Sequence, residues 1–135
     1  MNFSLGRSRV QNLNRSLTMR LVLAAAILVA SALPAAAAVD GQALFNAQCK
    51  SCHTVTGVSS PGGPSLKGVA GRKIAAAPGF TYSSGLKGKG GTWTDASLDA
   101  YLASPSVFAP GTRMFARVAQ PAARTAIIGY LKTVN

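Results

Sequence analysis

Two cysteines and a histidine lie together in the sequence, at Cys49, Cys52 and His53. Cysteines at this spacing with a histidine directly after the second are typical of covalent haem attachment. On a helix, residues three and four apart share a face, so both thiols reach the edge of one porphyrin. Each thiol forms a thioether with a haem vinyl group, and the imidazole binds the iron. The motif predicts one haem c, held covalently by Cys49 and Cys52, with His53 as an axial ligand.

Other uses of the same cysteines are possible in principle. A disulfide or a thioredoxin-like redox pair uses the same spacing, but no βαβ pattern surrounds these residues. A structural zinc site needs about four Cys or His ligands in a tetrahedron. The chain holds only two cysteines and one histidine, so it is short of ligands for such a site. The sequence therefore favours haem attachment over these alternatives.

The second axial ligand follows from the residues that remain. His53 is the single histidine, so the two imidazoles of a bis-histidine site are not available in one chain. The methionines are Met1, Met19 and Met114, and the first two precede the predicted cleavage site described below. Met114 follows Pro110-Gly111 in a predicted loop, where the backbone can present the side chain inward. We expect Met114 to bind the iron as a soft thioether ligand, which favours Fe(II) and raises the reduction potential.

The N-terminal region has the pattern of a secretory signal peptide. Four arginines and no acidic residue precede an apolar run from Leu21 to Leu33, which Pro34 ends. Small residues at Ala36, Ala37 and Ala38 suit cleavage. We place the cut after Ala38, with Ala37 and Ala36 as alternatives. A retained membrane anchor is the other interpretation, although the run is shorter than the roughly 20 residues that span a bilayer.

Residues 39–135 are predicted to form one small domain. They carry ten of the fourteen Lys and Arg residues and all three Asp residues, for a formal charge of +7. A basic chain can bind nucleic acid, but the export signal argues against that partner. The positive charge instead favours association with acidic proteins and makes it salt-dependent.

The apolar pattern predicts three main helices separated by irregular segments. The first spans Val39 to Cys52, with Asp40 as N-cap and with Gly41, Phe45, Cys49 and Cys52 on one stripe. The second begins after the N-cap Thr94 and ends at Ser104, before Pro105. The third begins at Pro121, after Gln120, which is a poor cap. Residues 55–91 and 107–117 read as loops because Gly, Ser and Pro interrupt any periodicity.

The order of these residues resembles the class I c-type cytochromes, close to the mitochondrial cytochrome c and bacterial cytochrome c2 group. The matching positions are Gly41 and Phe45, 49–55, 63–69, 71–73, 78–83, 92–93, 101–102, 110–114 and 130–132. The resemblance implies a small all-α cytochrome c fold, with three main helices and short turns around one haem. It also implies that the first and last helices cross at Gly41 and Phe45.

The resemblance further assigns polar contacts around the haem. Pro64 would accept a hydrogen bond from the His53 ring, and Tyr101 would bond the Met114 sulfur. The group also implies contacts with the haem propionates, from Tyr82 and Trp93 as donors, Arg72 nearby and Thr112. Two features depart from the group: the loop Ser83 to Leu86 lacks a usual polar residue, and lysines are fewer.

Together these features predict a periplasmic, monomeric electron carrier that is neither an enzyme nor an integral membrane protein. By resemblance, its partners would be a bc1-type donor and a terminal oxidase, photosynthetic reaction centre or periplasmic dehydrogenase. One alternative is a haem enzyme or gas sensor in which Met114 is displaceable. Another is a basic exported binding module without haem.

Overall fold

The computed structural model describes residues 38–135, so the predicted signal peptide, apart from Ala38, lies outside the described residues. The helices in this part of the chain are α2 (Gly41–Gln48), α3 (Ser84–Lys89), α4 (Asp95–Ala103), α5 (Pro105–Phe108) and α6 (Pro121–Leu131). Residues 38–135 form no strand, only isolated bridges between Ser60 and Gly63 and between Lys73 and Thr92. The predicted all-α class is confirmed.

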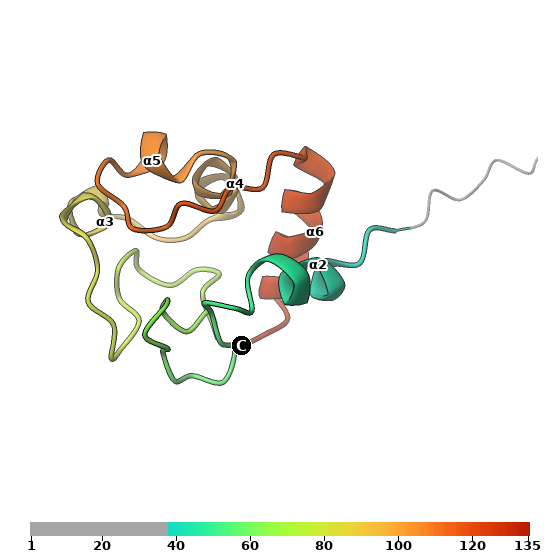
Figure 1. The fold of residues 1–135 in the computed structure, drawn as a ribbon, viewed down its shortest axis with the longest axis horizontal. Coiled ribbons are helices and arrows are strands. Elements are labelled where there is room, and N and C mark those ends of the chain that lie inside the picture. The colour runs from blue at the N-terminus through green and yellow to red at the C-terminus, as the bar shows by residue number, and fades with distance from the viewer. Residues whose placement is uncertain (1–37) are drawn as a thin grey trace, which may run out of the picture. The chain divides into compact units, whose positions relative to one another are not determined.

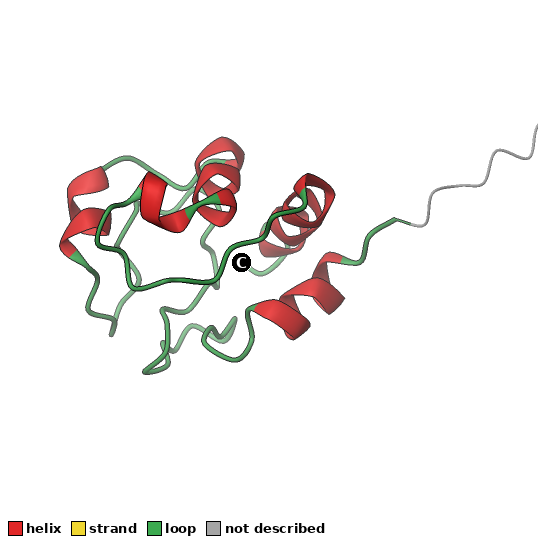
Figure 2. Cartoon of the chain, turned by 45° about the horizontal axis from the view of Figure 1, so that its top comes forward, coloured by secondary structure: helices red, strands yellow, loops and turns green. Residues whose placement is uncertain are grey.

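Helices α2 and α6 pack against each other, and α4 packs against α6 and α5 (Figure 1). The irregular segment between α2 and α3 runs along the side of the domain away from α4 and α5, and Figure 2 shows the same arrangement after rotation. None of helices α2 to α6 combines the length and apolarity that a bilayer span needs.

The crossing of α2 and α6 depends on Gly41. A Cβ atom at this position would lie 2.0 Å from the carbonyl oxygen of Ala126, so only glycine lets the two backbones approach this closely. One turn further, the rings of Phe45 and Tyr130 are 5.3 Å apart, and Phe45 and Ile127 are almost completely buried. The predicted crossing at Gly41 and Phe45 is confirmed.

Helix α2 is shorter than predicted. Asp40 caps it as expected, because its carboxylate accepts from the N–H groups of Gln42 and Ala43 at 2.9 and 3.2 Å. The helix ends at Gln48, where both Cys49 N and Lys50 N bond the carbonyl of Phe45. This change of hydrogen-bond register places the attachment motif on turns directly after α2.

The second main helix agrees with the prediction. Thr94 and Ser97 form a capping box at the start of α4, and Ser104 is its C-cap. Its apolar face, formed by Leu98, Tyr101 and Leu102, is buried.

The last helix also agrees. Pro121 is the first residue of α6, and Gln120 makes no capping bond. The guanidinium of Arg124 bonds Asp99 of α4 at 2.7 Å and the carbonyls of Val118 and Ala119, which fixes α6 against α4.

Two short helices were not predicted. Helix α3 lies in the segment expected to be a loop, although Ser83 caps it and Lys87 and Lys89 suit the negative end of its dipole. Helix α5 begins at Pro105 and extends into the predicted irregular segment. In both, an apolar residue is buried, Leu86 in α3 and Pro105 in α5. Tertiary burial therefore outweighs the weak local propensity.

Candidate haem-binding site

The attachment motif opens into a cavity of about 360 Å³ inside the domain. Its lining is mostly apolar and comes from α2, α3, α4, α6 and the loops between them. It includes every residue predicted to contact the haem: Cys49, Cys52, His53, Pro64, Arg72, Tyr82, Trp93, Tyr101, Thr112 and Met114. The structure thus brings the whole predicted set together around one space.

The two cysteines of the motif lie in different surroundings. Cys49 is half-buried and packs against the core, whereas Cys52 is exposed. Burial, with a smaller contribution from nearby Cys52, raises the pKa of the Cys49 thiol above its ordinary value. Since Cys52 N and His53 N both bond the carbonyl of Cys49, at 3.1 and 2.9 Å, the turn holds the three side chains of the motif in a fixed order.

The His53 ring is held on two sides. Its Nδ1 lies 2.9 Å from the carbonyl oxygen of Pro64, as the resemblance implied. A carbonyl only accepts, so Nδ1 carries the proton and donates, and Nε2 is the ring nitrogen left to bind the iron. A Cβ on Gly63 would lie 2.7 Å from Cε1 of the ring, so the backbone here is as close as glycine allows. This arrangement suits an axial ligand, since metal-binding histidines usually donate their second nitrogen to an oxygen.

Met114 lies in the loop between α5 and α6. It is half-buried, lines the cavity and packs against the core cluster. Its N–H donates to Thr112 Oγ1 at 3.3 Å, and the loop is closed further on by a bond from Val118 N to Leu102 O. The loop is therefore anchored on both sides of Met114.

Tyr101 and Thr112 bond each other, a contact that the resemblance did not imply. The Tyr101 hydroxyl lies 2.8 Å from Thr112 Oγ1, where the resemblance implied a bond to the Met114 sulfur. Both side chains are buried, and two buried hydroxyls satisfy each other where a neutral sulfur is the weaker acceptor. Burial raises the pKa of Tyr101, partly opposed by the Thr112 bond, so the hydroxyl stays protonated at neutral pH.

Tyr82 is placed by a hydrogen bond within the protein and Trp93 by packing against other rings. The Tyr82 hydroxyl accepts from Ala77 N at 3.2 Å, and burial raises its pKa. Trp93 is buried between Tyr101 and Phe108, with ring centroids 5.2 and 5.7 Å away. Because the Tyr82 hydroxyl accepts this bond, its own proton remains free to donate.

Arg72 provides a test of whether the cavity fits a haem. Its terminal nitrogens donate to Lys67 O and Ser65 O at 2.8 and 2.9 Å, but its buried Nε has no partner among the described residues. A buried donor without an acceptor is costly, so this nitrogen indicates a missing acceptor. A propionate carboxylate would supply that acceptor. Four features of the cavity together fit haem c: its apolar lining, the two neighbouring thiols of Cys49 and Cys52, the oriented imidazole of His53 and the unpaired nitrogen of Arg72.

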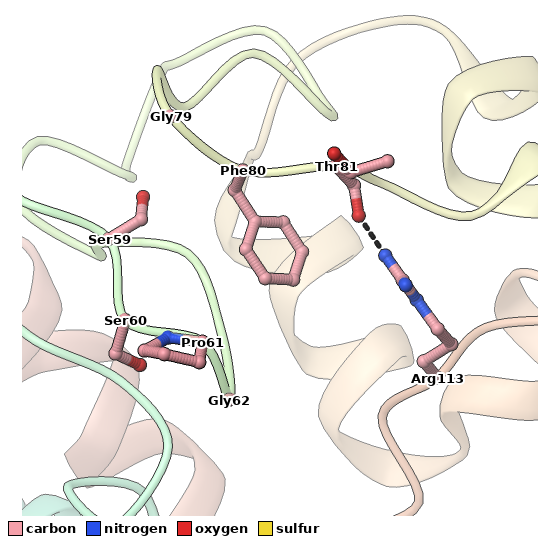
Figure 3. A pocket seen from close by; sticks show the side chains of 8 residues that line it. All are labelled: Ser59, Ser60, Pro61, Gly62, Gly79, Phe80, Thr81 and Arg113. Carbon is pink, nitrogen blue, oxygen red and sulfur yellow. Dashed lines mark hydrogen bonds between the residues drawn. The ribbon is translucent and has the colours of Figure 1, made fainter.

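Sequence reasoning missed the role of Arg113, which directly precedes Met114. Its guanidinium donates to the carbonyl of Thr81 and lies 5.7 Å from the ring centre of Phe80 (Figure 3). These contacts join the loop that carries Met114 to the segment before α3, beside a more open hollow of about 530 Å³. The only signal in the sequence was an arginine next to the candidate ligand Met114. Such neighbours are too common to predict which residue the arginine contacts.

Comparison with known proteins gives consistent matches. The family model described as cytochrome c matches residues 38–135. Cytochrome c2 from Rhodomicrobium vannielii is 40% identical over 121 residues, covering 88% of this chain and 96% of that protein. Cytochrome c2 iso-1 from Magnetospirillum molischianum is 44% identical, covering 67% and 93%. The structure of cytochrome cH from Methylobacterium extorquens has a TM-score of 0.65 and 41% identity, covering 71% and 97%.

Proposed function

Because the chain belongs to the cytochrome c family, and is an electron-carrier cytochrome with covalently bound haem c, we propose that it is a periplasmic shuttle whose iron is ligated by His53 and Met114. The observation that carries this proposal is the cavity shared by the attachment motif and Met114. Met114 is the single methionine of residues 38–135, and His53 is the single histidine of the chain. Thus the chain offers one nitrogen and one thioether ligand.

When bound, haem c supplies an iron that alternates between Fe(III) and Fe(II) and so carries one electron. The residues of the chain keep this change free of rearrangement. Pro64 and Gly63 fix the His53 ring, while Thr112 and Val118 anchor the loop of Met114. With both axial ligands supplied by the protein, no substrate needs to reach the iron.

The polar groups of the cavity have a second task. Tyr101 and Thr112 satisfy each other, and Arg72 provides a buried donor for one propionate. The apolar lining excludes water, and a low dielectric around a charged iron favours its less charged, reduced form. These residues therefore adjust the reduction potential of the haem, whose approximate value is determined by the axial ligands.

The location and partners rest on the sequence pattern and the relatives. We propose that residues 1–38 direct export and are removed, leaving residues 39–135 as the monomeric carrier in the periplasm. A bc1-type complex would reduce it, and a terminal oxidase, a photosynthetic reaction centre or a periplasmic dehydrogenase would be the other partner. Similarity to bacterial cytochromes c2 supports this assignment.

The test is the absorption spectrum of the purified protein with a conservative substitution at Met114. The oxidised wild type should show the weak long-wavelength Fe(III)–thioether band, and its reduced form should not bind CO readily. Met114→Leu preserves side-chain volume and removes the sulfur, so it should keep the covalent haem, lose the band and lower the reduction potential. Rapid CO binding by a wild type without the band would overturn His/Met ligation and favour a haem enzyme or gas sensor.

A further inference from the structure

Ser59 joins two other segments of the chain through its side chain. Its hydroxyl donates to the carbonyl oxygen of Pro78 at 2.9 Å and accepts the N–H of Ser65 at 3.1 Å. Both distances are ordinary hydrogen-bond lengths. Figure 3 shows the Ser59 side chain pointing toward the segment that contains Gly79, which directly follows Pro78. Ser59 therefore uses both functions of a hydroxyl, since it donates one bond and accepts another.

The N–H that Ser59 accepts belongs to the peptide group that orients His53. The carbonyl of Pro64 and the N–H of Ser65 form one peptide unit, and resonance within the unit links the two groups. The Pro64 oxygen lies 2.9 Å from Nδ1 of His53. A continuous chain of hydrogen bonds thus runs from the imidazole through this peptide group and the Ser59 hydroxyl to the Pro78 carbonyl.

All the bonds of this chain point the same way. The imidazole donates to the peptide carbonyl, the peptide N–H donates to the Ser59 hydroxyl, and the hydroxyl donates to Pro78. Hydrogen bonds aligned in this way polarise and strengthen one another, by about 10–30% per bond. The peptide group is shielded from solvent, because Ser65 is 1% exposed. A stronger bond from Nδ1 to the Pro64 carbonyl makes the imidazole more basic and hence a better ligand for Fe(III).

The side chain of Ser65 has a separate role in the same loop. Its Oγ accepts the N–H groups of Gly57 and Lys67 at 3.1 and 3.3 Å, so it holds the loop without taking part in the chain of bonds. Removing this hydroxyl would loosen the loop and leave the N–H of Ser65 in place. The loop therefore contains its own control, which separates a structural role from an electronic one.

We propose that Ser59 is a positioning residue that acts on the iron through the peptide group between Pro64 and Ser65. By strengthening the hydrogen bond that His53 donates, Ser59 stabilises the oxidised state and so lowers the reduction potential. This inference rests on the proposed function, because it takes His53 to be the axial ligand. It adds a residue that does not line the haem cavity and reaches the iron only through its neighbours.

The experiment compares three variants of the haem-loaded protein with the wild type. In Ser59→Ala the Pro64 carbonyl becomes a weaker acceptor, so the ratio of oxidised to reduced protein at a fixed potential should fall about twofold, an upward shift of about 18 mV in reduction potential. The Nδ1–H resonance of His53 in the reduced protein should move to higher field. Ser59→Thr keeps the hydroxyl and should leave both values unchanged.

The matched control is Ser65→Ala. This variant should lower the free energy of unfolding, because the N–H groups of Gly57 and Lys67 lose their acceptor. It should nevertheless keep the wild-type reduction potential and the wild-type Nδ1–H resonance of His53, since the backbone bond to Ser59 remains.

Each other result overturns either the role of Ser59 or the proposed function. A Ser59→Ala protein that is destabilised but keeps the wild-type potential and resonance shows that Ser59 only joins the loops. Equal shifts in Ser59→Ala and Ser65→Ala show that any loosening of the loop moves the imidazole. A wild type whose reduced spectrum lacks the ring-current-shifted protons of an axial imidazole overturns ligation by His53, on which the proposed function depends. With those protons present, only the role of Ser59 is at stake.

Discussion

The hydroxyl of Tyr101 lies 2.8 Å from Oγ1 of Thr112, and Oγ1 also accepts the N–H of Met114 at 3.3 Å. Through this pair, the buried face of α4 is connected to the loop that presents Met114. Both residues are buried, since Tyr101 is 8% and Thr112 is 7% exposed, so solvent does not readily replace this hydrogen bond. The pair therefore contributes both to stability and to the position of Met114.

Removing either hydroxyl should leave the other buried and unpaired. We expect Tyr101→Phe and Thr112→Val each to lower the free energy of unfolding by about 1–2 kcal/mol. The double variant should lose less than the sum, with a coupling of about 1 kcal/mol. Guanidinium titration of the haem-loaded protein measures these values. Tyr130→Phe is the control, because Tyr130 is only half-buried and its hydroxyl forms no hydrogen bond within residues 38–135. Additive single effects would contradict the pairing.

Alkaline pH should weaken the same contact. Burial raises the pKa of Tyr101 above its ordinary value of about 10, the Thr112 bond opposes this and nearby Tyr82 adds to it. A folded-state pKa above the unfolded one means that the folded protein holds its proton more tightly. The stabilisation is therefore fully present below about pH 10 and falls as the pH rises through the folded pKa. Unfolding free energies between about pH 8 and pH 11 should decline less steeply in Tyr101→Phe than in the wild type. Parallel curves would show that Tyr101 does not titrate differently on folding.

Much of the fold could be predicted because local signals and burial agree there. Asp40 and Thr94 are good caps, Pro121 suits a first helical position, and Gly41 on an apolar stripe indicates a close crossing. The haem-binding motif needed no tertiary information, since its chemistry lies in adjacent residues.

The remaining features depend on contacts between distant segments. Helix α3 has glycines at Gly85 and Gly88, so its propensity is low, and the Ser83 cap alone does not predict it without the burial of Leu86. The partner of Tyr101 could not be predicted, since a hydroxyl accepts several partners and geometry alone selects Thr112. The 90% exposure of Phe115 runs against its hydrophobicity, so it could not be predicted from the residue type.

The crossing of α2 and α6 can be tested with two glycines. In Gly41→Ala the new methyl group would lie 2.0 Å from the backbone oxygen of Ala126, so the helices must separate. We expect a loss of about 1–3 kcal/mol in the free energy of unfolding. Gly129→Ala, on the exposed side of α6 with no atom within 4 Å of the added methyl, should instead stabilise by up to about 1 kcal/mol. Thermal unfolding of both variants decides the matter, and equal stabilities would mean that the crossing tolerates a side chain.

Gly85 is expected to control the position of Met114. A Cβ at Gly85 would lie 1.9 Å from the carbonyl oxygen of Pro110 and 3.3 Å from the carbonyl carbon of Ala109. Both are backbone atoms of the loop that leads to Met114, so Gly85→Ala must displace the loop or α3. Overpacking of this kind costs about 1–3 kcal/mol. The displacement should also weaken the Fe(III)–thioether band and speed CO binding by the reduced protein.

The matched control for Gly85 is Gly88, in the same short helix. Its added methyl would meet no atom within 4 Å, so Gly88→Ala should raise helix propensity and stabilise by up to about 1 kcal/mol, with an unchanged band. Because both variants make the same chemical change in α3, a difference in the band between them reports on the contact with Pro110 and not on helix stability. A normal band and slow CO binding in Gly85→Ala would show that α3 does not position Met114. Loss of the band in both would mean that any change in α3 disturbs the ligand.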